Sequence, residues 1–560
     1  MAVVYMRKLE EEPETYDSKF TALTKGINLK VHDWVLDHIN KTETIIEVGC
    51  GTGKLATKMA LKDNNVLAFD KNPQMITVAM KNYPLEQDVN LLYQIGSFTD
   101  WSVEENSKDL IVSTFMLSEL RPLEQQIFLR NSWKALKPDG RIILAAEFLP
   151  SEFWKVSFKI KRWWYRKKLR QRKQKKTRLL NWFFKYIEPI GFKITDQKKW
   201  KHGAIQGLEL QKVKVNENDL PGYYRPEHKK SRGIHSQLRI YRCIFSGQID
   251  RVPIEPGIYK SGTPDKTSPI IVTANYEYTY IKVMRSLKHI DAWVLCVDSN
   301  GINVWCAARG NDFGNEQITE VVEATNIRNL TEKKTLILPQ LSAGGVAIPQ
   351  LPKKSEIFPF KIVYGPIWSK NLPQFLDERP ARKPDSMKIA KFSLKHRIRA
   401  GITHTTFLFR KIFLIPLICI LVLLFALNVF LGLEWSNNLW WVCEICLWII
   451  ITNMIICLLF PLSNFTRCFI CKGIFFGIIN IIVLGALTWI LHHSIWYVLL
   501  NLCLFMWIAF FSTMSFSGYT MSTNPREIQA SYPIFTTINI ILLIASIVLS
   551  TLGLIVLNII

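Results

Sequence analysis

Three glycines and two acids near the N-terminus have a spacing that suits cofactor binding. Gly49, Gly51 and Gly53 follow a short apolar run that contains Glu47, and Asp70 comes about 20 residues later. A glycine-rich turn between a strand and a helix lets a ligand approach the backbone, and an acid ending the next strand can hold ribose hydroxyls. The pattern therefore predicts a ribose-containing cofactor. Taken alone, it also fits a nicotinamide-binding fold.

A second candidate for chemistry is a cysteine far downstream. Cys306 lies in the segment GINVWCAARG, residues 301–310, where Asn303, Trp305 and Ala307 surround it. A thiolate is a strong, soft ligand that pushes electron density onto a metal. A cysteine flanked by Trp and Ala is also typical of a buried apolar position. The residue types alone therefore leave a metal ligand and a core residue as alternatives.

Alternating strands and helices must position the glycine turn. Residues 44–49 read as a strand, 54–62 as a helix, and 66–69 as a second strand that ends at Asp70. This order predicts a Rossmann-like α/β domain over residues 1–215.

A second α/β domain is expected over residues 251–378, after a polar linker at 216–250. Apolar runs that read as buried strands alternate with helical stretches, which predicts another parallel layer. These runs lie at 270–276, 292–298, 334–341 and 360–365. Cys306 falls between the second and third of them.

The last third of the chain reads as a membrane domain. Its apolar runs each reach the roughly 20 residues needed to cross a bilayer. We expect an all-α domain of five transmembrane helices, at 412–433, 439–462, 469–491, 495–514 and 532–560. The basic segment 379–411 and the loop residues Arg467 and Arg526 place the first amino end and both soluble domains in the cytoplasm. The chain is thus expected to be a multi-pass protein of the cytoplasmic (inner) membrane, in contact with lipid.

The net charge of +24 is concentrated in two places, the juxtamembrane segment and an insert at residues 154–185. The insert mixes Lys and Arg with Trp and Phe, which is typical of a helix at a membrane surface, although a solvated charge run has a similar composition. No nucleic-acid module accompanies it, so no nucleic-acid partner is expected. Eleven cysteines without a signal peptide predict no disulfide framework and a reducing compartment.

Four membrane cysteines form two Cys-x-x-Cys pairs, Cys443/Cys446 and Cys468/Cys471. Together they have the composition of a zinc or iron–sulfur set. At 1.5 Å rise per residue, however, the helix between them separates the pairs by some 30 Å, so one shared site is not expected. Apolar packing is the favoured interpretation, and capture of a soft metal by one pair is the alternative.

The N-terminal motifs resemble those of class I S-adenosylmethionine-dependent methyltransferases. The sequence Glu47-Val48-Gly49-Cys50-Gly51-Thr52-Gly53 matches the family's first motif, and Asp70 matches its ribose-binding acid. The resemblance also implies the later strands of the family's fold, at 109–113, 136–144, 191–194 and 208–213. The resemblance implies S-adenosylmethionine as cofactor, bound by Glu47, the three glycines and Asp70. The chain has Gly96-Ser97-Phe98 where the family often carries an acid for adenine. Nothing in the sequence identifies the methyl acceptor.

The segment around Cys306, together with most of residues 250–560, resembles the mercury-methylation corrinoid proteins, relatives of the large subunit of the corrinoid iron–sulfur protein. The resemblance implies cobalamin as a second cofactor, with Cys306 as the axial ligand of cobalt. The chain departs from the family pattern at Arg309-Gly310 and at Ile348-Pro349-Gln350. The cobalamin-binding residues that the resemblance implies are Thr273, Asn303, Trp305, Cys306, Ala307, Gln340, Gly344, Gly345, Val346, Tyr364 and Gly365.

These resemblances imply a corrinoid-dependent methyltransferase that passes a cobalt-bound methyl group to a soft acceptor, with mercuric ion favoured. A relative that methylates an arsenic species and a non-catalytic metal-binding membrane sensor are the alternatives. The chain has no cluster-binding cysteine run, so a separate ferredoxin-type reductant is expected, and a separate methyl-donor enzyme is a further candidate partner. The sequence leaves the fused S-adenosylmethionine domain without an assigned acceptor, and we expect the two domains to act separately.

Overall fold

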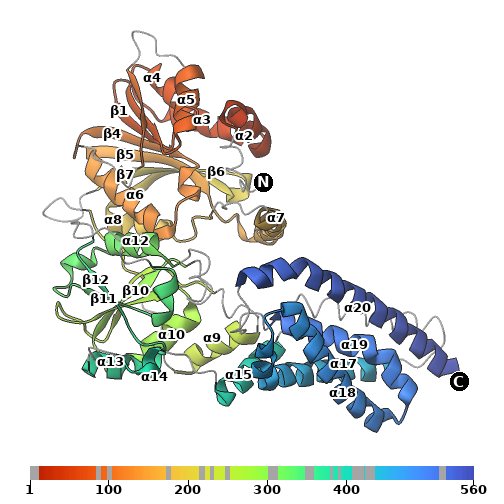
Figure 1. Ribbon diagram of the computed structural model, residues 1–560. Coiled ribbons are helices and arrows are strands. Elements are labelled where there is room, and N and C mark those ends of the chain that lie inside the picture. The colour runs from red at the N-terminus through yellow and green to blue at the C-terminus, as the bar shows by residue number, and fades with distance from the viewer. Residues whose placement is uncertain are drawn as a thin grey trace. The chain divides into compact units, whose positions relative to one another are not determined.

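A computed structural model describes residues 12–82, 90–97, 104–171, 178–213, 221–227, 233–245, 252–299, 313–346, 358–378, 383–388, 393–406, 422, 436–515 and 525–559 (Figure 1). The chain divides into two compact units. The first unit comprises Met1–Ser231 and Pro253–Lys383, and the second comprises Arg232–Val252 and Pro384–Ile560.

Seven of the described strands form the sheet of the N-terminal domain, in the order β3-β2-β1-β4-β5-β7-β6. Strands β1 to β5 are parallel, and β7 lies antiparallel between β5 and β6. The bounds are β1 Thr44–Val48, β2 Asn65–Asp70, β3 Leu91–Ile95, β4 Lys108–Thr114, β5 Leu136–Glu147, β6 Phe192–Trp200 and β7 Ile205–Lys212. The expected Rossmann-like domain is confirmed.

Helices cover both faces of this sheet, because successive strand residues point to opposite sides. Ile45 packs with the cluster formed by α3, α4 and α5, whereas its neighbour Ile46 packs with the cluster that contains α6 and α8. The helices are α2 Tyr16–Thr24, α3 Ile27–Asp37, α4 Lys54–Ala60, α5 Pro73–Asn82, α6 Pro122–Ala135, α7 Glu152–Gln171 and α8 Phe184–Ile190. The result is a three-layer sandwich.

The second α/β region of the first unit contains a sheet of described strands in the order β12-β11-β9-β10-β8. Strands β9 to β12 are parallel, as expected, and β8 joins the edge antiparallel to β10. The bounds are β8 Gly257–Ser261, β9 Ile270–Ala274, β10 Ala292–Val297, β11 Thr335–Leu338 and β12 Lys361–Tyr364. Its described helices are α10 Glu277–Ser286, α12 Asn315–Thr325 and α13 Leu372–Glu378. The short helix α14 Asp385–Lys388 follows in the chain and belongs to the second unit.

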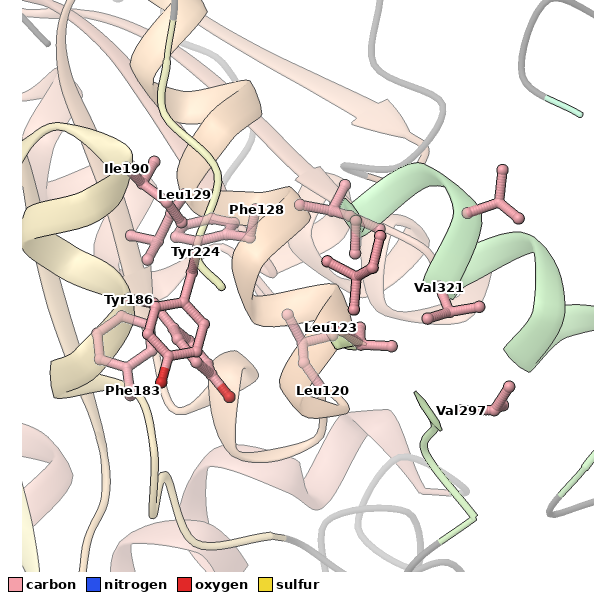
Figure 2. Close-up of a cluster of buried hydrophobic side chains, with 14 of the residues drawn as sticks. Leu120, Leu123, Phe128, Leu129, Phe183, Tyr186, Ile190, Tyr224, Val297 and Val321 are labelled. Carbon is pink, nitrogen blue, oxygen red and sulfur yellow. The ribbon is translucent and has the colours of Figure 1, made fainter. Parts of the chain in front are cut away.

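A single hydrophobic cluster connects the two sheets of the first unit. It runs from α6 and α8 to α12 and the strands of the second sheet. Figure 2 shows Leu123 of α6 and Val321 of α12 on facing sides of the two helices, and both side chains are fully buried. The ring of Tyr224 packs on Tyr186 of α8 with centroids 5.0 Å apart. The two α/β regions therefore share a core.

The second unit is helical throughout the part that the structure describes. Helices α9 Gly233–Phe245 and α15 Leu394–Thr405 accompany α17 Ser436–Leu459, α18 Phe469–His492, α19 Ile495–Ser515 and α20 Pro525–Ile559. Four of the described helices are long and apolar enough to cross a membrane, with spans at Cys443–Phe465, Phe469–His492, Ile495–Met514 and Ala530–Leu549. The remaining expected span, 412–433, lies outside the described residues apart from Val422.

Candidate functional site

The glycine turn after β1 adopts the backbone that its sequence predicts. Gly49, Gly51 and Gly53 have φ values of +76°, +55° and +76°, which are left-handed conformations that L side chains rarely adopt. A Cβ atom at Gly51 would meet no described atom within 4 Å, so open space lies above this residue. A Cβ at Gly49 would come within 2.8 Å of the Met116 side chain. The turn thus packs closely on one side and stays open to a ligand at Gly51.

Asp70, the predicted ribose acid, lies directly beside this turn. Its Oδ2 accepts a hydrogen bond from the Gly51 amide at 3.0 Å, and its Oδ1 accepts one from the Asn72 amide at 2.8 Å. A carboxylate has about four acceptor positions, so two remain for a pair of hydroxyls. The backbone of the next strand is close as well, because the Gly96 amide donates to the Asp70 carbonyl. The structure therefore brings the turn and the acid together.

Glu47 lies under the turn and is fully buried. Its Oε2 has no hydrogen-bond partner among the described residues. Burial, together with the smaller effect of the nearby negative charge of Asp70, raises the pKa of Glu47 to about 8. A buried carboxyl group with one oxygen lacking a described partner fits a cationic ligand group, such as the ammonium or sulfonium of S-adenosylmethionine.

The chain leaves β4 through a strained residue that sequence reasoning did not single out. Phe115 has φ +65°, which is unusual for an aromatic residue and costs of order 1–3 kcal/mol. The following 3-10 turn, Met116–Ser118, carries Ser118, whose hydroxyl accepts a hydrogen bond from the Glu147 amide at 2.9 Å. This bond joins the carboxyl ends of β4 and β5 on the cofactor side of the sheet. No sequence motif marks Phe115 or Ser118.

Helix α7, the first part of the expected 154–185 insert, is anchored at the same edge. Arg162 donates a 2.8 Å ion-paired hydrogen bond to Glu147, and both side chains are buried. On its other side α7 presents Phe153, Val156 and Ile160, which are 87%, 66% and 54% exposed. Their spacing puts these apolar residues on one helical face.

The second sheet brings several of the implied corrinoid residues to one edge. Gln340, Tyr364 and Gly365 lie at the carboxyl ends of β11 and β12. Lys383 donates hydrogen bonds to the Gln340 side chain and to the carbonyls of Tyr364 and Gly365. Sequence reasoning missed Lys383, because it lies in the basic juxtamembrane segment and has no motif around it.

Thr273, near the end of β9, is another of the implied corrinoid-binding residues. It is completely buried, and its Oγ1 has no hydrogen-bond partner among the described residues. Gly344 ends the 3-10 helix Gln340–Gly344 and Gly345 follows it, while the Val346 carbonyl accepts a 2.9 Å hydrogen bond from the Tyr364 hydroxyl. The remaining implied residues lie outside the described residues, namely Asn303, Trp305, Cys306 and Ala307.

The membrane cysteines show different environments. Cys468 caps the start of α18, where its sulfur accepts a 3.3 Å hydrogen bond from the Cys471 amide, and both thiols are exposed. Cys443 is exposed and Cys446 half-buried on α17. Among the described residues no group of three or more His, Cys, Asp or Glu side chains could hold a metal ion.

Two known protein families match separate parts of the chain. Residues 45–140 match a family described as a methyltransferase domain, and residues 231–347 match the CO dehydrogenase/acetyl-CoA synthase delta subunit family. The gamma subunit of the acetyl-CoA decarbonylase/synthase complex of Methanopyrus kandleri is 31% identical over 139 residues, and that of Methanocaldococcus jannaschii is 30% identical over 109. These matches cover 24% and 19% of this chain and only 29% and 22% of the relatives.

Two solved structures are similar to the N-terminal domain. A S-adenosylmethionine-dependent methyltransferase from Methanosarcina mazei is 17% identical with a TM-score of 0.27 and covers 32% of this chain and 96% of its own. One from Corynebacterium glutamicum is 17% identical with a TM-score of 0.28, covering 36% and 99%. The chain thus joins a S-adenosylmethionine-dependent methyltransferase domain to a region similar to the delta subunit of CO dehydrogenase/acetyl-CoA synthase.

Proposed function

We propose that this protein is a corrinoid-dependent methyltransferase of the cytoplasmic membrane. A methyl group carried on the cobalt of cobalamin would pass to a soft acceptor, and the family resemblance around Cys306 favours mercuric ion. The fused N-terminal domain binds S-adenosylmethionine through the glycine turn, Asp70 and Glu47. A ferredoxin-type protein would supply the low-potential electrons that keep the cobalt reduced.

The observation that supports this proposal is the strand order of the second sheet on either side of the chain segment that contains Cys306. At the centre of the second sheet, β9 lies between β10 and β11. The chain therefore crosses from one side of β9 to the other between β10 and β11. Ligands of open parallel sheets bind outside the carboxyl ends of the strands at such a switch point. In the sequence, Cys306 lies between the carboxyl end of β10 and the start of α12, outside the described residues.

The described residues at this edge fit a large cofactor with many amide groups. Thr273 provides a buried hydroxyl without a partner among the described residues, and Gln340 and Tyr364 add polar groups at neighbouring strand ends. Cys306 would ligate the cobalt as a thiolate, and the strand ends would hold the edge of the corrin. When bound, the corrinoid supplies a cobalt centre that can accept and release a methyl group.

The proposal is tested by reconstituting the full chain with cobalamin in detergent and supplying a labelled methyl donor, a strong reductant and a panel of acceptors. We expect methylmercury as the product. Methylated arsenic would retain the corrinoid chemistry and change the acceptor. A protein that binds soft metals yet never binds cobalamin would be a membrane sensor, and the proposal would then be wrong.

A further inference from the structure

Helices α6 and α12 lie side by side and run in the same direction. At the start of α6, Arg121 places Nε 2.6 Å from Oε2 of Glu320 and Nη1 3.6 Å from Glu316, in the first half of α12. Later in α6, Arg130 donates hydrogen bonds to the carbonyls of Glu323 and Ala324, near the end of α12. Residues at the start of α6 therefore contact the first half of α12, and residues later in α6 contact the end of α12.

This alignment fixes the orientation of the two ligand-binding edges. Helix α6 follows β4, and α12 is the helix described between β10 and β11, so each helix runs back along its sheet from the carboxyl edge. Because the two helices are parallel, the carboxyl edges of both sheets lie on the same side of the first unit. The glycine turn and the switch point of the second sheet therefore open toward a common side.

One arginine bridges the two edges directly. The Arg178 amide donates a hydrogen bond to the Ser118 carbonyl, beyond the end of β4, and its guanidinium donates to Asp298 at 2.6 Å, beyond the end of β10. Asp298 also accepts a 3.3 Å hydrogen bond from Asn275, beyond the end of β9. On the opposite side Ser118 accepts from the Glu147 amide. Hydrogen bonds thus run without interruption from one sheet to the other.

The junction is an extended contact in which the linker takes part. Arg225, in the described linker segment 221–227, donates a 2.7 Å hydrogen bond to the Thr325 carbonyl at the end of α12. Lys185 pairs with Glu255 at 3.3 Å, and Leu123 and Val321 close the apolar part (Figure 2). Two regions that share a core and several buried polar contacts move as one body, whereas a flexible tether would leave them independent.

We propose that the methyl acceptor of the N-terminal domain is the cobalt centre of the corrinoid in the adjacent domain, an inference that rests on the function proposed above. The carbon–sulfur bond of the sulfonium breaks and its electron pair stays on sulfur, which becomes a neutral thioether. Cobalt(I) supplies the electron pair of the new cobalt–carbon bond and becomes formally cobalt(III). The ferredoxin-type protein provides the low-potential electrons that prepare cobalt(I). Arg178 is a positioning residue that holds the two edges in register.

The test uses the full chain loaded with cobalamin under strong reduction. Label from methyl-labelled S-adenosylmethionine should remain with the corrinoid after gel filtration and be released by light. A second readout is binding: calorimetry should show that cobalamin changes the affinity for S-adenosylhomocysteine by at least about fivefold, a typical coupling between linked sites. Arg178→Ala should remove most of this coupling while both ligands still bind.

The matched control is Arg225→Ala, which deletes another polar contact of the same junction at the end of α12, away from both carboxyl edges. It should keep the coupling. The inference is overturned if cobalamin binds and accepts methyl from a folate-type donor but takes none from S-adenosylmethionine, and the two affinities are independent. A chain that binds no cobalamin at all overturns the proposed function, and this inference with it, so the two failures are distinguishable.

Discussion

The amide of Gly51 donates a 3.0 Å hydrogen bond to Oδ2 of Asp70, so the turn and the acid are joined in the cofactor-free chain. Asp70→Ala should therefore weaken binding of S-adenosylmethionine in two ways, by removing the acceptor of the ribose hydroxyls and by releasing the turn. A hydrogen bond to a charged group is worth about 1.5–3 kcal/mol, or roughly 10- to 150-fold in affinity. Calorimetry on the full chain measures this. Asp139→Ala, at an exposed position at the opposite end of the sheet, is the control, and equal affinities for the two variants would exclude Asp70 from the site.

Glu47 should make cofactor binding depend on pH. Its pKa of about 8 means that the free site holds a proton at neutral pH. A cationic cofactor prefers the carboxylate, so binding should release a proton below pH 8. The apparent affinity should then rise between pH 6 and 8. Calorimetry in buffers of different ionisation enthalpy counts the proton, and Glu47→Gln should abolish the release. A pH-independent affinity in the native chain would contradict this role.

The raised pKa of Glu47 should also make the stability of the folded chain depend on pH. In the unfolded chain Glu47 loses its proton near the ordinary pKa of a glutamate, whereas the folded chain keeps it up to about pH 8. The folded state thus binds more protons between these values, and its stability should fall as pH rises through this window. Glu47→Gln should flatten this part of the pH profile of thermal unfolding in detergent. A steeper profile would contradict the assignment.

The Arg121–Glu320 pair should stabilise the junction between the two sheets. The side chains are 17% and 4% exposed, and burial raises the pKa of Glu320 although Arg121 opposes this. Arg121→Met leaves the carboxyl group unpaired and should cost about 3–5 kcal/mol at neutral pH. The cost should shrink toward low pH, because Glu320 can then become neutral.

The double variant Arg121→Met/Glu320→Met should recover most of the lost stability, since neither charge remains buried. Lys81→Met, which breaks an exposed ion pair with Glu14, is the control and should have no measurable effect. Thermal unfolding of the full chain in detergent compares these variants. If Arg121→Met and Lys81→Met unfold alike, the pair does not stabilise the junction.

The exposed face of α7 should bind anionic membranes. Phe153, Val156 and Ile160 would enter the interface, and the surrounding Lys and Arg would contribute about 1 kcal/mol each at low salt. A peptide of residues 152–185 should bind vesicles that contain phosphatidylserine, and binding should weaken as salt increases. Replacing the three apolar residues by serine should reduce binding to the purely electrostatic part. A peptide that ignores anionic vesicles at low salt would leave the insert as a solvated charge run.

Local patterns were sufficient for much of the fold. The apolar runs around Ile45 and Val294 predicted strands, and the alternation of strands and helices predicted both parallel layers. Strand β8, Gly257–Ser261, was missed because it is short and carries the polar pair Lys260 and Ser261. It becomes a strand only through pairing with β10, which is a tertiary effect.

The relation between the domains could not be predicted from local patterns. Arg121 and Glu320 are far apart in the sequence, and each looks like an ordinary charge on a helix surface. Only folding shows that they form a buried pair and that α6 and α12 are parallel. The expectation that the two domains act separately was made without knowledge of these contacts. Arg178 could not be singled out either, because no motif distinguishes it from its basic neighbours.

The corrinoid function proposed for the second domain depends on Cys306 as the ligand of cobalt. The protein reconstituted with cobalamin should show a thiolate-to-cobalt absorption band, and Cys306→Ala should abolish it. Cobalamin can still bind through contacts with the corrin, since binding and axial ligation are separate. Transfer of methyl to a soft cation should nevertheless collapse, because the electron density supplied by sulfur is lost.

A histidine at this position separates ligation from electron donation. Nitrogen can ligate cobalt but donates less charge than a thiolate, so Cys306→His should keep a ligated spectrum while the transfer rate falls. Cys443→Ala, which removes an exposed thiol in the second unit, controls for general effects of cysteine loss and should change neither property. If Cys306→Ala transfers methyl at the native rate with an unchanged cobalt spectrum, Cys306 is a packed core residue. The corrinoid would then be held at the strand ends without a thiolate ligand.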